Sequence, residues 1–235
     1  MLHGDFKHAV ESCNLALRAA ESSLPVNHPD HVESWNLLGS IRLRTGDVHR
    51  AEEAYDQAMK LCKTLPMGST RITNVNSNLA VLYQETGRLQ LARAIFEEVL
   101  RNRLKAFSTN HVKIGDAKNA LGNVYQSLGW YDQAELQYME ALRIFSRHVD
   151  VNGLSVMKNW ASLAEARQDF AQADQIRGDI EAFAKGIFPP GHIAIAEAEL
   201  GRFASLFALG KIEEALKISQ RYLLAAHENL KTAAE

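Results

Sequence analysis

Histidine and acidic side chains lie close together in the stretch NHPDHV, at His28, Asp30 and His31. Imidazole nitrogens and carboxylate oxygens are ligands that zinc and related metals take from proteins, so this spacing raises the question of a metal site. Two further histidines, His111 and His192, stand in the segments NHVK and GHIA. Whether these residues bind a metal depends on the elements that hold them.

An internal repeat determines where these histidines lie. A glycine followed five residues later by an alanine recurs along the chain, and Gln168 takes the glycine's place once. The pairs are Gly4/Ala9, Gly46/Ala51, Gly87/Ala92, Gly129/Ala134, Gln168/Ala173 and Gly210/Ala215. Successive first members are 42, 41, 42, 39 and 42 residues apart. His28, His111 and His192 each lie 18 residues before such a first member, so each has the same place in its repeat.

The histidines therefore mark the boundaries between repeats, where one helix has ended and the next begins. Pro29 suits a first helical turn. The residues that can offer a side-chain oxygen to free N–H groups at these helix starts are Asn27, Ser69, Asn110 and Asp150. Equivalent residues of successive repeats stand too far apart to share a metal with bonds of about 2 Å. We predict that the chain binds no metal, although His28 and His31 alone could make a weak two-ligand site.

Between the boundaries the apolar residues follow helical spacing. In residues 114–128 and 131–145 they recur mostly at intervals of three and four, which is typical of amphipathic helices. The glycine position supplies the tight turn between two antiparallel helices, and the alanine allows their close approach. Neither helix of such a hairpin can bury its apolar stripe alone, so stacked hairpins are expected to share a continuous core.

The residues of each hairpin resemble the tetratricopeptide repeat (TPR). The signature residues are Trp35, Leu38, Gly39, Ala51, Tyr55 and Ala58 in one unit, Leu79, Ala80, Tyr83, Ala92 and Phe96 in the next, and Leu121, Gly122, Tyr125, Ala134 and Tyr138 in the third. In the last two units Arg177 and Ser219 replace the aromatic residue. The period is longer than the usual 34 or so residues. With the segment HPDHV, it is similar to the long-repeat class found in kinesin light chains.

The resemblance implies an all-α fold, a right-handed α-solenoid of stacked antiparallel helical hairpins, or TPR-like superhelix. We expect a single domain over residues 1–235, with a half repeat at 1–26 and repeats at 27–67, 68–109, 110–149, 150–190 and 191–235. Eleven helices are predicted, at 5–22, 30–44, 48–65, 70–86, 88–107, 111–128, 131–148, 152–167, 170–185, 192–208 and 211–230. Pro189 and Pro190 make the most marked break.

The first predicted helix corresponds to the second helix of a hairpin, so its mate is missing. Either the chain is cut from a longer protein or a lone helix caps the stack. Part of its apolar stripe is then expected to be uncovered, and such a patch usually marks a contact. The stripe consists of Phe6, Ala9, Val10, Cys13 and Leu17. We predict self-association through this N-terminal helix.

An asparagine recurs on the predicted first helices, at Asn36, Asn78, Asn119 and Asn159, and Asn123 lies one turn beyond Asn119. The resemblance implies that the first helices line the concave side, and that similarly placed asparagines in kinesin light chains hold an extended peptide's backbone. Asparagine is a poor helix former, and its amide both donates and accepts. The predicted peptide-binding residues are Asn36, Ser40, Asn78, Asn119, Asn123 and Asn159. The alternative stays open that the asparagines are merely exposed or bond to neighbouring turns.

A different use of the TPR fold, the carboxylate clamp for chaperone tails, is not favoured. It needs Lys, Asn, Asn, Lys and Arg on three successive first helices. The matching residues are Asn36, Ser40, Asn78, Asp116 and Ala120. Only Asn78 agrees, and Asp116 carries the wrong charge.

Composition argues against several classes of protein. The chain has 235 residues, 46% of them hydrophobic, and a formal net charge of −2, so a nucleic-acid or anionic membrane partner is not expected. It shows no signal peptide and no run of 18 apolar residues. Cys13 and Cys62 form no CxxC pair and suit a reducing compartment. We expect a cytoplasmic protein.

No catalytic motif is found, since the chain has no glycine-rich phosphate loop, no GxSxG and no HExxH. The carboxylates predicted to lie on solvent-facing sides of second helices include Glu52, Glu53, Glu135, Glu213 and Glu214. We interpret the chain as a non-catalytic, cofactor-free scaffold or adaptor that binds a protein or peptide in its concave groove. The alternative is a regulatory sensor module of a larger signalling or transcription-control protein.

Overall fold

The computed structural model describes residues 2–25, 28–66, 69–146 and 152–232, without the side chains of residues 2–7, 20–21, 225–226 and 228–232. Within these ranges the chain forms α-helices and no strand, which confirms the expected all-α fold. It divides into two compact units, Met1–Leu128 and Gly129–Glu235. The predicted caps Asn27 and Asp150 and the side chain of Phe6 lie outside the described residues.

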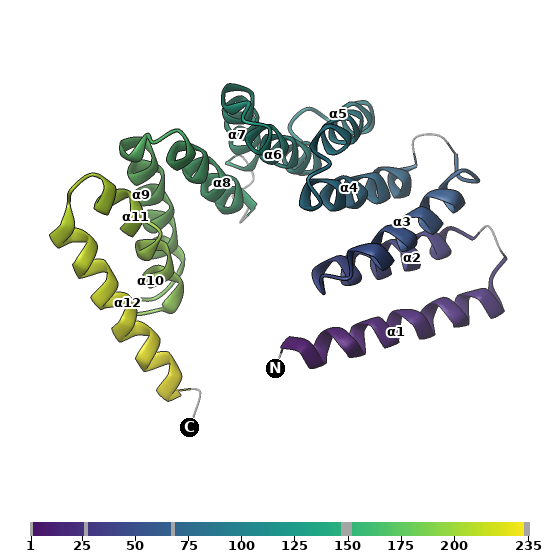
Figure 1. Cartoon of the computed structure of the whole chain (residues 1–235), viewed down its shortest axis with the longest axis horizontal. Helices are drawn as coiled ribbons and strands as arrows, with labels where there is room; N and C mark the ends of the chain where they lie inside the picture. Colours follow the sequence, from purple (N-terminus) through teal and green to yellow (C-terminus); the bar gives the residue numbers. More distant parts are fainter. Residues whose placement is uncertain (1, 26–27, 67–68, 147–151, 233–235) are drawn as a thin grey trace. The chain divides into compact units, whose positions relative to one another are not determined.

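The described residues of the first unit form six helices that follow one another in space as they do along the chain (Figure 1). They are α1 (Leu2–Ser23), α2 (Pro29–Arg44), α3 (Val48–Cys62), α4 (Thr70–Glu85), α5 (Leu89–Ala106) and α6 (Val112–Ser127). Each helix packs against the next, and α2 also packs against α4. The hairpins α2–α3 and α4–α5 are therefore stacked, as the repeat pattern predicts.

The second unit contains α7 (Tyr131–Phe145), α8 (Asn152–Ala166), α9 (Phe170–Ile187), α10 (Ile193–Leu200), α11 (Phe203–Ala208) and α12 (Ile212–Thr232). The prediction of one helix over 192–208 is wrong, because a turn at Gly201 and Arg202 divides it into α10 and α11. The Arg202 N–H donates to the Glu199 carbonyl three residues back, at 2.9 Å, which tightens the chain there. Gly201 favours such a break because glycine is a poor helix former.

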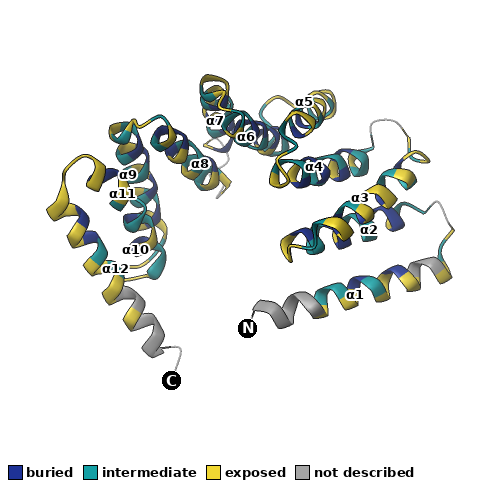
Figure 2. Cartoon of the chain, in the orientation of Figure 1, coloured by how far each residue is buried: buried dark blue, intermediate teal, exposed yellow. Residues whose placement is uncertain are grey.

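Close approach of the two helices inside each hairpin depends on the repeated alanines. Those at 51, 92, 134 and 173 are fully buried, and Ala215 is 1% exposed. Figure 2 shows the buried sides of the helices facing one another within each unit. In α2–α3 the ring of Tyr55 lies against Gly39, where an added Cβ would come within 2.6 Å of a ring carbon. No larger residue fits at Gly39 unless Tyr55 moves.

The turn between the helices of a hairpin needs a left-handed residue. Gly46, Gly87, Gly129 and Gly210 have φ between 74° and 80°, and Gln168 occupies the same place with φ 62°. Gln168 is the only described non-glycine residue with positive φ. Such a conformation brings the side chain of an L-residue too close to its own backbone, so Gln168 is strained where its equivalents are not.

In the last hairpin the large and small residues have exchanged helices. Counting from the glycine of the turn, Phe203 stands at the position of Gly39, and Ser219 stands at the position of Tyr55. Phe203 packs against the buried cluster of Leu206, Ala215 and Ile218. The aromatic residue that the repeat pattern lacks at Ser219 is therefore supplied by the first helix.

The N-terminal helix is better covered than its missing mate suggests. Cys13 and Leu17 are 8% and 5% exposed, because they pack with Val10 against Leu38 and Ala54 of the first hairpin. The stripe is therefore covered at Cys13 and Leu17, whereas Ala9 and Val10 are half-buried. Self-association through α1 stays a prediction.

We predict that Gln168→Gly raises the free energy of unfolding by up to about 1 kcal/mol, since glycine removes the steric cost of positive φ. The reverse change at an equivalent turn, Gly129→Gln, should cost about 1 kcal/mol. Urea unfolding of both variants measures these effects. A loss of stability in Gln168→Gly would mean that the glutamine side chain contributes more than its strain costs.

Candidate functional site

The boundary histidines cap helices. His28, His111 and His192 are the N-cap residues of α2, α6 and α10, and all three have extended backbones with ψ between 135° and 138°. In each, Nδ1 accepts from the backbone N–H two residues on, at 3.1–3.3 Å. The structure thus confirms that these histidines lie at helix starts, with Pro29 in the first turn of α2. The capping acceptor, however, is the histidine side chain itself.

The predicted capping oxygens are only partly correct. Ser69 is the N-cap residue of α4, but its side chain makes no capping hydrogen bond. At α6 the cap is His111 and not Asn110, since the hydrogen-bonded turn from Ser108 to His111 places the imidazole next to the first free N–H. The His111 ring also lies against the Phe107 ring, with the centroids 4.4 Å apart and the planes tilted by 30°.

The paired histidines of the first boundary have separate tasks. His31 is 4% exposed, and its Nε2 lies 3.1 Å from the Pro25 carbonyl, so it ties the loop to α2. His28 Nδ1 is already used as the cap acceptor for Asp30. Within the described residues, no group of three or more His, Cys, Asp or Glu side chains is arranged to hold a metal ion.

The predicted peptide-binding residues of the first unit lie on α2, α4 and α6, the first helices of its repeats. We call this set the asparagine surface, and it consists of Asn36, Ser40, Asn78, Asn119 and Asn123. All five are half-buried. Asn78 Nδ2 donates to Asn36 Oδ1 at 2.9 Å, so two of the predicted amides are in direct contact. Asn159 belongs to the second unit, where it is half-buried on α8.

Side chains of α2 and α4 also contact neighbouring helices, and these contacts hold the asparagine surface in place. Gln84 Nε2 on α4 lies 3.5 Å from Ser127 Oγ on α6. Ser40 lies beside the hydroxyl of Tyr55, where burial raises the pKa of the phenol and Ser40 counteracts part of the shift. The asparagine amides therefore sit on a surface whose helices are joined by side-chain contacts.

Two apolar residues beside the asparagines were not predicted. Leu37 on α2 is 54% exposed and Val81 on α4 is 36% exposed. They follow Asn36 by one residue and Asn78 by three, so they belong to the same helices and the same region of them. Sequence periodicity assigns apolar residues to the core. No signal in the sequence marks Leu37 and Val81 as exposed, because exposure depends on which residues of other helices pack against them.

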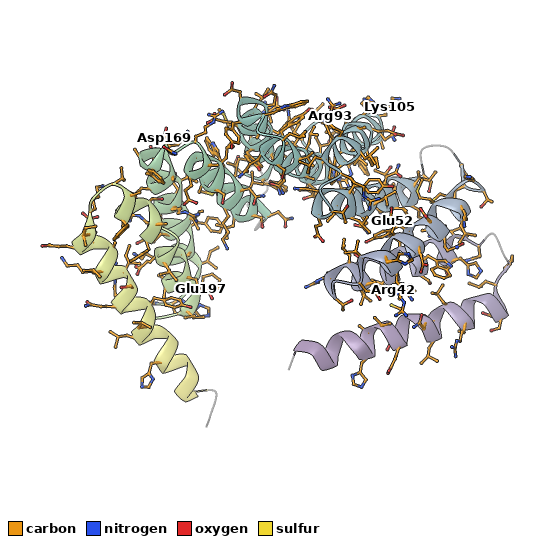
Figure 3. All side chains as sticks on the ribbon, in the orientation of Figure 1. Arg42, Glu52, Arg93, Lys105, Asp169 and Glu197 are labelled. Carbon is orange, nitrogen blue, oxygen red and sulfur yellow. The ribbon has the colours of Figure 1, made fainter. Side chains whose placement is uncertain are left out.

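Several carboxylates predicted to face solvent instead join neighbouring hairpins. Glu52 on α3 accepts two hydrogen bonds from Arg88, at 2.6 and 3.0 Å, which lower the pKa of the Glu52 carboxyl. Glu52 is labelled in Figure 3. Glu135, 23% exposed, accepts from Arg167 at 2.7 Å and from Trp160 at 3.2 Å. The solvent-facing prediction holds for Glu53, Glu213 and Glu214 and is wrong for Glu52 and Glu135.

A larger charge network crosses the second unit. Arg202 donates to Asp174 at 2.7 Å and to Glu181 at 3.0 Å, and Lys185 lies 3.0 Å from the buried Glu199. Burial by itself raises the pKa of Glu181, but hydrogen bonds from Lys185 and Arg202 outweigh it and lower the pKa. The charges are paired across α9, α10 and α11, which is an arrangement for joining helices.

Comparison with known proteins identifies the repeat. Two family models described as "Tetratricopeptide repeat" match residues 32–64 and residues 71–147. No curated protein sequence matches the chain. No described helix is long and apolar enough to cross a membrane.

Solved structures share the fold. BtubC (BKLC) from P. vanneervenii has a TM-score of 0.75 and 22% identity, over 96% of this chain and 89% of that one. A putative kinesin light chain from Podosopora anserina with nearly identical TPR-like repeats has a TM-score of 0.75 and 19% identity, over 86% and 98%. The apo form of RapI has a TM-score of 0.62 and 13% identity, over 96% and 93%. At these identities the likeness is one of fold.

We predict that His111→Ala lowers the free energy of unfolding by about 1 kcal/mol, because the Lys113 N–H loses its acceptor. His111→Asn keeps an acceptor at the cap and should cost less, as chemical denaturation will measure.

Because the boundary histidines serve helix ends, EDTA should leave the Tm of the unaltered protein unchanged. A drop of several degrees on chelation would contradict the capping interpretation.

Proposed function

We propose that this chain, which matches tetratricopeptide repeat models over residues 32–64 and 71–147 and shares the fold of a kinesin-light-chain-like structure, is a non-catalytic scaffold that binds an extended peptide along the first helices of its hairpins. Stacked helical hairpins commonly present extended concave surfaces to partner proteins. Fold alone does not fix function, so the proposal rests on the residues of the asparagine surface.

The observation that carries the proposal is the contact between Asn36 and Asn78. Each amide has an oxygen with two lone pairs and two N–H groups. Their shared hydrogen bond uses one N–H of Asn78 and one lone pair of Asn36, and it fixes the orientation of both side chains. The remaining N–H and C=O groups suit the alternating donors and acceptors of an extended backbone, whatever its side chains.

The exposed apolar residues add a source of specificity. A peptide whose backbone lies on the amides would bring alternate side chains toward the helices. Leu37 and Val81 are exposed on the same two helices, so an apolar peptide side chain could be buried there. The exposed Asp116 on α6 disfavours an acidic chain end at that position.

The cysteines support the proposal that this scaffold acts in the reducing cytoplasm. Cys13 and Cys62 are free thiols, and both are buried. Burial raises the pKa of both thiols, which keeps them protonated and unreactive.

We predict that Asn78→Ala combined with Asn119→Ala weakens a bound peptide by about 1–3 kcal/mol, or roughly 5- to 150-fold, since each lost hydrogen bond contributes about 0.5–1.5 kcal/mol. The Tm should hardly change, because alanine is the better helix former and offsets the lost contact to Asn36. A partner found by pull-down, followed by calorimetry with the double variant, provides the measurement.

Asn102→Ala is the matched control, since Asn102 is also half-buried but lies on the second helix α5. It should leave the affinity unchanged. Intact binding in the double variant with a sharp fall in Tm would assign the asparagines to stability and move the interaction surface elsewhere.

A further inference from the structure

The second unit contains a cavity where α7, α8 and α9 meet. It is partly open and has a volume of about 430 Å³, which lies within the range of about 300–1,000 Å³ that is typical of small-molecule sites. Most of its lining is apolar. The apolar side chains that line it are Leu142, Phe145, Leu154, Met157 and Phe183.

Gly153 accounts for part of this space. It lies on α8, 15 residues before the turn residue Gln168, and it also lines the cavity. The residues at the same distance before the other turns are all larger, and they are His31, Ile72, Ile114 and Ile195. His31, Ile114 and Ile195 are 4%, 0% and 8% exposed, so these side chains fill the core of their repeats. At α8 the corresponding space is left unfilled.

The backbone of α8 does not require a glycine at this position. An added Cβ at Gly153 has one described neighbour within 4 Å, the Cβ of Phe145 at 3.4 Å, which is an ordinary van der Waals contact. Glycine is also among the poorest residues for a helix. Neither a close approach nor helix propensity explains the glycine, and its distinguishing effect is the open space beside Phe145.

The core of the second unit fixes one wall of the cavity. Leu154 and Met157 pack against the buried cluster of Ala161, Ile176 and Ile180, so α8 cannot move inward to close the cavity without losing these contacts. An empty apolar cavity lowers the stability of a fold, and it stays dry because it offers water too few hydrogen-bond partners. An apolar ligand would supply the missing contacts.

One charged side chain lines the cavity. Arg143, in the last turn of α7, is exposed, and no carboxylate of the described residues forms an ion pair with it. By contrast, Arg167, Arg177 and Arg202 of the same unit each have a carboxylate partner at 2.7 Å. The planar guanidinium of arginine matches a carboxylate with two parallel hydrogen bonds. Because a single cation is present, a singly charged head group suits it better than a phosphate dianion.

Apolar walls with one unpaired guanidinium at the rim match an amphiphilic ligand. We propose that this cavity binds a small fatty-acid-like carboxylate, whose unbranched apolar chain lies beside Gly153 and whose head group pairs with Arg143. The site lies within the second unit and contains no residue of the asparagine surface. It is therefore an activity beyond peptide binding, and the two can succeed or fail independently.

Calorimetric titration of the full chain with decanoate tests the proposal. Decanoate should bind at a single site and raise the Tm. Octanoate should bind at least about tenfold more weakly, since each buried CH₂ changes the dissociation constant about fourfold. Arg143→Gln should weaken decanoate about three- to fivefold and leave the binding of decanol unchanged, because decanol lacks the charged head group. Arg143→Lys keeps the charge and should retain most of the affinity.

Gly153→Ile tests the cavity itself, because it introduces the side chain that Ile114 provides in α6. It should weaken decanoate at least about tenfold and raise the Tm of the ligand-free chain. Ser155→Ile is the matched control, since Ser155 is an exposed residue of the same helix, and it should leave the affinity unchanged.

Three results would overturn the proposal. The first is the absence of saturable decanoate binding to the unaltered chain, which would make the cavity a packing defect only. The second is equal weakening by Gly153→Ile and Ser155→Ile. The third is an equal effect of Arg143→Gln on decanoate and decanol, and this variant changes an exposed residue, so it does not depend on how the fold tolerates a change at Gly153.

Discussion

The contact of the large Tyr55 ring with the small Gly39 across the α2–α3 hairpin is the constraint on which the stacking of the first repeats depends. In α2–α3 the Tyr55 ring occupies the space that Gly39 leaves open, and the fully buried Ala51 keeps the two helices close. With the two helices this close, Leu43, Ala51 and Tyr55 form one buried cluster with Leu79 and Leu82 of the next hairpin. The surface amides of α2 and α4 come into contact as a result of that stacking.

Much of the fold could be predicted because it depends on local spacing. From Gly46 onward the glycine position identified the left-handed turn between paired helices, including the one at Gln168, where the residue type is wrong for the conformation but the backbone adopts it with φ 62°. The period of the apolar residues identified the hairpins for the same reason. The break at Gly201 was missed, because the ion pairs of Arg202 with Asp174 and Glu181 come from residues 28 and 21 positions away.

Less of the candidate site could be predicted, since its contacts join residues one repeat apart. Glu52 was predicted to face solvent because its partner Arg88 lies 36 residues further along the chain. The hydrogen bond from Asn78 to Asn36 was not predicted for the same reason. The histidines were placed at the right boundaries, but the capping role was given to their neighbours. Oxygen donors are the usual caps, whereas an imidazole nitrogen performs the task at His111.

In the last hairpin the large residue, Phe203, is on the first helix and the small one, Ser219, is on the second. This reversal limits which helices could be exchanged between repeats. A recombinant that joined α11 to a second helix such as α3 would bring Phe203 and Tyr55 into one space, and a hybrid of α2 with α12 would set Gly39 opposite Ser219 and leave a void. The last hairpin can be transplanted only with both its helices. The boundary of an exchangeable segment in this chain therefore runs between hairpins, at the histidine caps, and not at the glycine turns.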